Sequence, residues 1–328
     1  MPSLPSPFSV DPSAVTAERD GAVLTVRVDN PPLNFLNAAL MDRLADTLAA
    51  ARRDPDVRAV VLTGATPGVF IGHYDIDEIL DGVRRAGVAL PERLAPVPLR
   101  VLAPLVRVPR LRAALAATPV GGLVSLLRFH EVIRSMRRSD TVFVAAIDGP
   151  ALGGGFELAL GCDIRVTGDG PYDLGQAELL LGLVPGGGGS QLLARMLGSA
   201  RTIELLLEGR LFSPAEALEA GLVHHVVPRD EVVKHAHEVA SRLATRSASA
   251  VGAAKRLVYE ASSASVERGL AAERASFLAL AGGAPAQRAL GRYLDDIRAH
   301  LASGGGAADF SRTRLPRWQA GTATGFRG

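Results

Sequence analysis

Cysteine is nearly absent from this sequence, which has only Cys162 among its 328 residues. A single thiol cannot close a disulfide within the chain, and it cannot supply a thiolate cluster for a metal ion. We therefore expect a protein of a reducing compartment, the cytoplasm, with no metal site. The first 14 residues lack the basic and apolar regions of a secretory signal, and we expect them to be a flexible N-terminus.

An excess of charge of either sign is also missing, because the formal net charge is only +2. A weak overall field makes nucleic acid an unfavourable partner. Three arginines near the end, Arg312, Arg314 and Arg317, fit a solvated tail better than a track of phosphate contacts. The balance of 48% hydrophobic and 21% charged residues is that of a globular protein with a substantial core.

The sequence has no uninterrupted hydrophobic run that could cross a bilayer. The nearest candidate, residues 97–127, contains Arg100, Arg107, Arg110 and Arg112 as well as several prolines. Arginine is costly at the centre of a bilayer. We expect no membrane span, although this segment could lie on an apolar surface.

Two short apolar runs, which begin at Arg58 and Thr141, are rich in β-branched residues and predict buried strands. Each run leads into a loop and then into a helical pattern, so the predicted fold class is α/β with a mostly parallel sheet. Upstream, alternating apolar residues around Asp20-Gly21 predict a hairpin, and residues 38–53 predict a helix. Ligand sites in such sheets lie at the carboxyl ends of the strands.

The predicted domain organisation has three parts after the N-terminus. Residues 15–222 form the α/β core, and within it residues 80–127 are an atypical apolar insertion over one side of the site. Residues 223–302 carry apolar positions at helical spacing and form a separate helical region. Residues 303–328 lack periodicity, so we expect a flexible tail or one that crosses onto a neighbouring subunit.

Three consecutive glycines, Gly153, Gly154 and Gly155, directly follow the second predicted strand and its loop. They permit a backbone whose amide hydrogens point outward unpaired, and a helix that begins at Phe156 adds its positive end. The lysine and serine of a Walker A loop are missing, and the dinucleotide-binding glycine pattern is incomplete. The chemistry that these glycines favour is therefore the binding of an oxyanion.

Glu157 follows the glycines inside an otherwise apolar helix, which predicts that it is buried and needs a partner or a task. The alternative is a first-turn glutamate that favours the helix dipole. A second acid, Glu178, also lies in an apolar run before a glycine turn. Two carboxylates in one dry pocket repel each other, which separates their pKa values and makes one a base and the other an acid near neutral pH.

Three stretches carry a family resemblance: IDGPALGGGFELALGCDIRV from residue 147, AELLLGLVPGGGGSQLLARMLG from residue 177, and LFSPAEALEAGLVHHVV from residue 211. They resemble the enoyl-CoA hydratase/isomerase family, also called the crotonase family, and the resemblance extends over residues 15–280. It implies a crotonase-like spiral of repeated β-β-α units with a C-terminal helical oligomerisation region. It also implies an acyl-CoA thioester substrate, no cofactor beyond the coenzyme A of that substrate, and a homotrimer or a dimer of trimers.

The resemblance assigns roles to particular residues. The amides of Tyr74 and Gly154 match the oxyanion hole that holds the thioester oxygen, Glu157 and Glu178 match two catalytic glutamates that hold one water, and the amide of Gly186 matches a further contact to that water. Relatives that isomerise double bonds keep only one of the two acids or place them elsewhere, so the presence of both favours hydration. Substrate or water contacts are further implied for His73, Asp75, Gly153 and Gly155.

The chain departs from the family pattern at His73 and Tyr74, where relatives have a glycine and small residues. Either both side chains pack against the insertion, or one of them touches the substrate. The leading hypothesis is a 2-enoyl-CoA hydratase. The alternatives are a double-bond isomerase or an acyl-CoA hydrolase of the same fold, and a non-catalytic acyl-CoA-binding subunit in which His73 and Tyr74 have spoiled the oxyanion hole.

Overall fold

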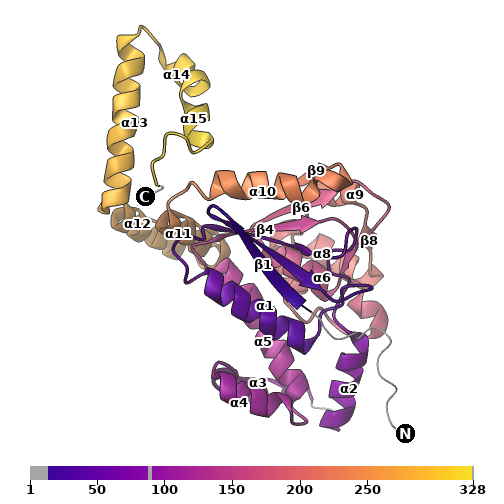
Figure 1. Cartoon of the computed structure of the whole chain (residues 1–328). Coiled ribbons are helices and arrows are strands. Elements are labelled where there is room, and N and C mark those ends of the chain that lie inside the picture. Colours follow the sequence, from indigo (N-terminus) through magenta and orange to yellow (C-terminus); the bar gives the residue numbers. More distant parts are fainter. Residues whose placement is uncertain (1–13, 88–90, 327–328) are drawn as a thin grey trace.

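The computed structural model describes residues 14–87 and 91–326, so the expected flexible N-terminus lies outside the described residues except for residue 14. A six-stranded sheet forms the centre of the fold (Figure 1). Its strands, in their order across the sheet, are β1 Ala14–Asp20, β2 Val23–Asp29, β3 Ala59–Gly64, β4 Val142–Ile147, β6 Ile164–Gly168 and β9 His225–Val227. β1 and β2 form the predicted antiparallel hairpin, and the other neighbours pair in parallel, as expected.

Both faces of this sheet are buried, because successive residues of a strand point to opposite sides. In β3, Val60 and Leu62 join the core beneath α1 Ala38–Ala51 and α5 Gly121–Arg137, while Ala59 and Val61 join the core beneath α10 Val232–Leu243. Figure 1 shows α10 on one side of the sheet and α1 and α5 on the other. The continuous apolar runs that predicted these strands follow from this burial on both faces.

A second, smaller sheet gives the fold its spiral. It consists of β5 Ala151–Leu152, β7 Leu174–Gly175 and β8 Leu211–Phe212, and single parallel bridges from Leu36 to Tyr74 and from Ile71 to Ala151 extend the same pattern. Each turn of the chain therefore places one strand in the large sheet, a short extended segment in the small one, and then a helix. This is the expected spiral of β-β-α units.

The remaining helices of the core follow these short segments. They are α2 Ile76–Ala86, α6 Gly154–Gly161, the 3-10 turn η1 Glu178–Leu181, α7 Gly189–Leu197, α8 Ser199–Glu208 and α9 Pro214–Glu219. α6 begins at Gly154, two residues earlier than expected, because the glycine triplet forms the first turn of the helix rather than only the loop before it.

The helical region begins later in the chain than expected. β9 adds a strand to the large sheet, and Val232 and Ala236 of α10 fill one of its faces, so the first part of residues 223–302 belongs to the core. Three residues are too few to show a strand period in the sequence. A short 3-10 turn, η2 Arg229–Glu231, leads into α10, and after it come α11 Ala248–Tyr259, the turn η3 Ala261–Ser263, α12 Val266–Ala281 and α13 Ala284–Ala302.

The tail carries more structure than its sequence predicts. α14 Ala307–Thr313 and α15 Leu315–Gln319 fold back along α13, and the three helices project from the body (Figure 1). The indole of Trp318 donates a hydrogen bond to Asp296 at 2.9 Å, and its ring meets the edge of Tyr293. Arg314 and Arg317, expected to be solvated, approach the same Asp296 at 3.7 and 3.9 Å.

The insertion forms a helical hairpin of α3 Pro96–Val106 and α4 Pro109–Ala116 below α5 (Figure 1). Its residues 88–90 lie outside the described residues. Arg112 of α4 and Arg128 of α5 both contact the carboxylate of Asp42 on α1, at 3.2 and 3.1 Å. The insertion is therefore held against the core. Across residues 14–87 and 91–326, every helix is too short or too polar to pass through a bilayer.

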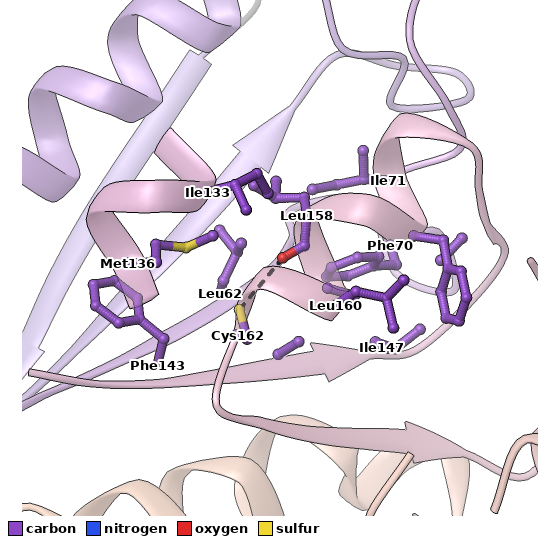
Figure 2. Packing of buried hydrophobic residues seen from close by; sticks show 14 of the residues in the cluster. Leu62, Phe70, Ile71, Ile133, Met136, Phe143, Ile147, Leu158, Leu160 and Cys162 are labelled. Carbon is purple, nitrogen blue, oxygen red and sulfur yellow. Dashed lines mark hydrogen bonds between the residues drawn. The ribbon is translucent and has the colours of Figure 1, made fainter. Parts of the chain in front are cut away.

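Cys162 lies in the core directly after α6, among side chains that include Leu62, Met136 and Phe143 (Figure 2). Its thiol donates to the carbonyl of Leu158 at 3.6 Å. Burial raises the pKa of this thiol to about 12.

We expect Cys162 to resist thiol reagents in the native protein, because the packing excludes the reagent and burial suppresses the reactive thiolate. In native buffer near pH 8, the rate of labelling by an aromatic disulfide should equal the rate of unfolding. In concentrated guanidinium chloride, which unfolds the protein, labelling should be complete at once. Absorbance of the released thiolate measures both. Labelling within seconds in native buffer would contradict the packing in Figure 2.

Candidate active site

Three segments that are far apart in the sequence meet at one end of the small sheet. The amide of Leu152 donates to the carbonyl of Gly72 at 2.7 Å, and the amide of Gly153 donates to that of Gly175 at 2.9 Å. Parallel strands end at the same edge of a sheet, so the residues that follow each strand lie together. Segments 73–75, 153–157 and 176–178 therefore surround one site.

Tyr74 and Gly154 lie against each other in this site. A Cβ atom built on Gly154 would lie 3.5 Å from the amide nitrogen of Tyr74. On either side of Tyr74, the carbonyl of His73 and the amide of Asp75 are bonded to Leu36. In the hydrogen bonding of the described residues, the amides of Tyr74 and Gly154 donate to no backbone carbonyl. Both N–H groups are therefore available to an oxyanion.

The other two glycines of the triplet shape the backbone. Gly153 has φ +47°, a conformation that favours glycine, and a Cβ atom there would lie 3.0 Å from Oε1 of Glu178. A Cβ atom on Gly155 would lie 2.0 Å from the carbonyl oxygen of Ile71, which no side chain could tolerate. The fold therefore requires glycine at both positions, apart from the substrate contacts that the resemblance implies for Gly153 and Gly155.

Glu157 is buried, with 1% of its surface exposed, and it has the partners that its surroundings demanded. Its Oε1 accepts hydrogen bonds from the amides of Gly187 and Gly189, both at 2.7 Å. Burial, together with the charge of Glu178, raises the pKa of Glu157 to about 7 despite these two bonds, which lower it. The group can therefore gain or lose a proton near neutral pH.

Glu178 opens η1 and is half-buried, and burial raises its pKa also. Gln176, itself 1% exposed, holds it. With the amide turned so that both of its ends are satisfied, Gln176 donates to Oε2 and Oε1 of Glu178 at 2.8 and 2.6 Å. Gln176 also lies next to Glu157. A Cβ atom built on Gly189 would lie 2.8 Å from the Gln176 side chain and 3.0 Å from Oε1 of Glu157. Gln176 thus lies between the two carboxylates.

The two unusual side chains of the first loop turn to different partners. His73 stacks on Phe35, with ring centroids 3.9 Å apart, rather than on the insertion. Tyr74 lies near Phe129 of α5, and its hydroxyl donates to Glu78 at 3.0 Å. Burial, followed by the charge of Glu78, raises the pKa of Tyr74 above its ordinary value.

Asp75 and Gly186, which the resemblance implied to contact substrate or water, have protein neighbours of their own. The carboxylate of Asp75 caps α2, where it accepts hydrogen bonds from the amides of Asp77 and Glu78. Gly186 lies beside Leu126 of α5, with its Cβ position 3.6 Å from that side chain. The glycine amides that donate to the Glu157 carboxylate are those of Gly187 and Gly189.

Sequence reasoning missed Gln176 and Phe129. The signal for Gln176 was an amide side chain two residues before the acid Glu178. Phe129 had no such signal, because it lies on a helix that follows the insertion. Cβ positions on Gly154 and Gly187 would lie 3.4 and 2.4 Å from its ring, so Phe129 forms a wall of the site. In the described part of the chain, no three His, Cys, Asp or Glu side chains are arranged to hold a metal ion.

A family model described as enoyl-CoA hydratase/isomerase matches residues 18–94 and 124–302 of this chain. The chain belongs to this family. A probable enoyl-CoA hydratase of Mycobacterium bovis is 33% identical over 264 residues, which cover 80% of this chain and 88% of that protein. The residues between the two matched segments, 95–123, contain α3 and α4.

Solved structures agree with the crotonase fold. An enoyl-CoA hydratase from Polaromonas sp. JS666 matches with a TM-score of 0.70 and 27% identity, covering 86% of this chain and 96% of that one. A monofunctional enoyl-CoA isomerase from M. smegmatis matches with a TM-score of 0.55 and 25% identity, covering 78% and 97%. The crotonase fold thus carries both reactions, and the fold alone does not choose between them.

The raised pKa of Glu157 predicts how stability depends on pH. The unfolded chain releases this proton near pH 4.5 and the native protein near pH 7, so the native state binds more protons in between. The stability that Glu157 contributes is therefore complete below about pH 4.5, and about 3 kcal/mol of it is lost as the pH rises through 7.

We accordingly expect Glu157→Gln to unfold at a higher urea concentration than the wild type near pH 8 and at a similar one near pH 4.5, since the amide cannot ionise. Exposed Glu238 on α10 provides the control, and Glu238→Gln should show no such dependence. A difference between Glu157→Gln and wild type that stays constant with pH would refute the shifted titration.

Proposed function

We propose that the protein is an enoyl-CoA hydratase that adds water across the 2,3 double bond of an enoyl-CoA thioester. The observation that carries the proposal is the meeting of four groups at one site: the adjacent free amides of Tyr74 and Gly154, and the two carboxyls of Glu157 and Glu178 with raised pKa values. Coenzyme A enters as part of the substrate, and no other cofactor is proposed.

The two amides would hold the thioester carbonyl oxygen. Attack at C3 moves negative charge onto this oxygen as the thioester becomes an enolate, and preformed donors stabilise that charge in the transition state more than the neutral carbonyl. Each donor contributes roughly 3 kcal/mol in comparable sites. The positive end of α6, which begins at Gly154, adds to the same effect.

The two glutamates would handle the protons. One removes a proton from the water whose oxygen bonds to C3, and the other delivers a proton to C2, so one water is added overall. The raised pKa values of both groups support proton transfer by this pair, and Glu157, whose pKa is about 7, can act as acid or base near neutral pH. Gln176 supports it by fixing the carboxylate of Glu178.

Glu157→Gln and Glu178→Gln should each lower the kcat for hydration of a short 2-enoyl-CoA by roughly two to four orders of magnitude, while a saturated acyl-CoA binds almost unchanged. The loss of ultraviolet absorbance of the conjugated thioester reports hydration, and calorimetry reports binding. Glu238→Gln serves as the control and should retain wild-type turnover. Unchanged turnover in both site variants would remove the assignment.

Product analysis of the wild type separates the alternatives. Hydration removes the conjugated absorbance and yields a 3-hydroxyacyl thioester, isomerisation creates or shifts a double bond, and hydrolysis releases free thiol. Tight acyl-CoA binding without conversion of any tested ester would indicate the non-catalytic subunit. The stacking of His73 on Phe35 and the hydrogen bond of Tyr74 to Glu78 give both side chains protein partners, which argues against that last alternative.

The amide of Gly154 can be tested without removing a side chain. Proline is tolerated at the first position of a helix and has no N–H, so Gly154→Pro should lower kcat roughly 100- to 1000-fold. Gly154→Ala keeps the N–H, and its Cβ would meet Tyr74 and Phe129 at an ordinary 3.4 Å, so it should retain most activity. Circular dichroism melts check folding. Equal activities of the two variants would show that this amide is not a donor in the reaction.

We further propose that the protein assembles as a homotrimer or a dimer of trimers in the cytoplasm. The helical region supports assembly, because α12 exposes Phe277 and Leu278 at 70% and 72% and α13 exposes Leu290 and Leu294 at 55% and 49%. Such apolar surface on isolated helices is typical of a subunit contact.

A further inference from the structure

The hairpin of α3 and α4 lies at the end of the molecule opposite α13–α15 (Figure 1). Its outer surface, called here the hairpin face, mixes apolar and cationic side chains. The apolar members are between 45% and 61% exposed: Leu94, Val97, Val101, Val108 and Leu111. The cationic members, all exposed, are Arg93, Arg100, Arg107 and Arg110.

The outward direction of these side chains follows from what the hairpin buries. α3 turns Leu102 and Val106 toward Val124 of α5, so Val97 and Val101, one turn apart, point away from the core. In α4, Arg112 turns inward to Asp42. The hairpin is therefore packed and ion-paired on its inner side, and the hairpin face is its solvent side.

The charge of the hairpin face is not compensated locally. Residues 93–130 contain no aspartate or glutamate, and Glu92 at the edge of the face is the nearest acid in the sequence. Arg93, Arg100, Arg107 and Arg110 have no ion pair or side-chain hydrogen bond to any of the residues 14–87 and 91–326, in contrast to Arg112 and Arg128 nearby. These four exposed guanidinium groups are therefore available to an external partner.

This mixture suits a lipid headgroup layer better than a protein partner. Each arginine lies within about one turn of an exposed apolar side chain, so a protein covering the face would have to desolvate the guanidinium groups along with the valines and leucines. At an anionic bilayer the guanidinium groups pair with phosphates while the apolar side chains enter the boundary below them.

We propose that the hairpin face binds reversibly to the surface of anionic lipid membranes. The helices lie on the bilayer and do not cross it. The family model leaves residues 95–123 unmatched, so this function would be an addition to the family fold. The proposal rests on the hairpin face alone and does not depend on which reaction the site performs.

The test is sedimentation of the full-length protein with vesicles of phosphatidylcholine alone or with about a third phosphatidylglycerol. Each arginine near an anionic leaflet strengthens binding about fivefold, so the double variant Arg100→Gln/Arg107→Gln should bind the anionic vesicles about 30-fold more weakly. Raising the salt concentration should weaken the wild type similarly. Val101→Ser should reduce binding without any change in charge.

A matched control is available on α1. Arg52 and Arg53 are exposed, and Arg52 ends α1 as Arg107 ends α3, so Arg52→Gln/Arg53→Gln removes the same charge at an equivalent position. This control should bind like the wild type, and all variants should retain the wild-type melting temperature and turnover.

Three results would overturn the proposal. They are absence of wild-type binding to anionic vesicles, equal weakening by the α1 and α3 variants, and equal binding to both kinds of vesicle. Soluble poly-glutamate separates the remaining possibility. If it binds the wild type while anionic vesicles do not, the hairpin face serves an acidic protein and not a membrane.

Discussion

The register of the parallel segments in the small sheet is the constraint on which the site depends. Two backbone bonds, from the amide of Leu152 to Gly72 and from the amide of Gly153 to Gly175, align the ends of three consecutive turns of the spiral. In an extended strand, successive amides point in opposite directions, so a slip of one residue would turn the amide of Tyr74 away from that of Gly154. Side-chain chemistry alone could not restore the pair.

The buried charge of Glu157 sets a second constraint, in which stability opposes function. Burial disfavours the carboxylate, and the amides of Gly187 and Gly189 recover only part of that free energy, since the pKa still rises to about 7. If hydrogen bonds offset the whole cost of burying the Glu157 carboxylate, the fold would be more stable at neutral pH. The pKa of Glu157 would then be lower, and the group would hold no proton to donate near neutral pH. The incomplete compensation is what keeps a proton available near neutral pH.

Local patterns in the sequence predicted the main strands and helices, and they predicted that a buried Glu157 needs partners. They did not identify the groups that donate hydrogen bonds to it. The Asp20-Gly21 hairpin, the strands after Arg58 and Thr141 and the isolation of Glu157 all follow from periodicity and neighbours. The identity of the donors to Glu157 depends on a loop 30 residues later, which no local pattern encodes. The family resemblance implied a contact from the nearby amide of Gly186 to a water, and that contact stays a prediction.

Other misses have simple physical causes. The capping of α2 by Asp75 was missed, although an aspartate three residues before a glutamate and ahead of an apolar run is a helix-capping signal. β9 was too short to show a period. The tail helices α14 and α15 are short and gain their order by packing on α13, which is tertiary context that the sequence pattern does not contain.

The insertion shows how a new surface can be added without disturbing the sheet. Its ion pairs go to α1, its apolar contacts go to Val124 of α5, and the same α5 carries Phe129 to the wall of the site. Because α5 is one continuous helix from Gly121 to Arg137, anything that orients the hairpin face also orients the site. A rigid helix of this kind fixes the orientation of the site relative to the hairpin face without a second conformation of the protein. Attachment of the hairpin face to a membrane would therefore set the direction in which the site faces, and would not switch its activity on.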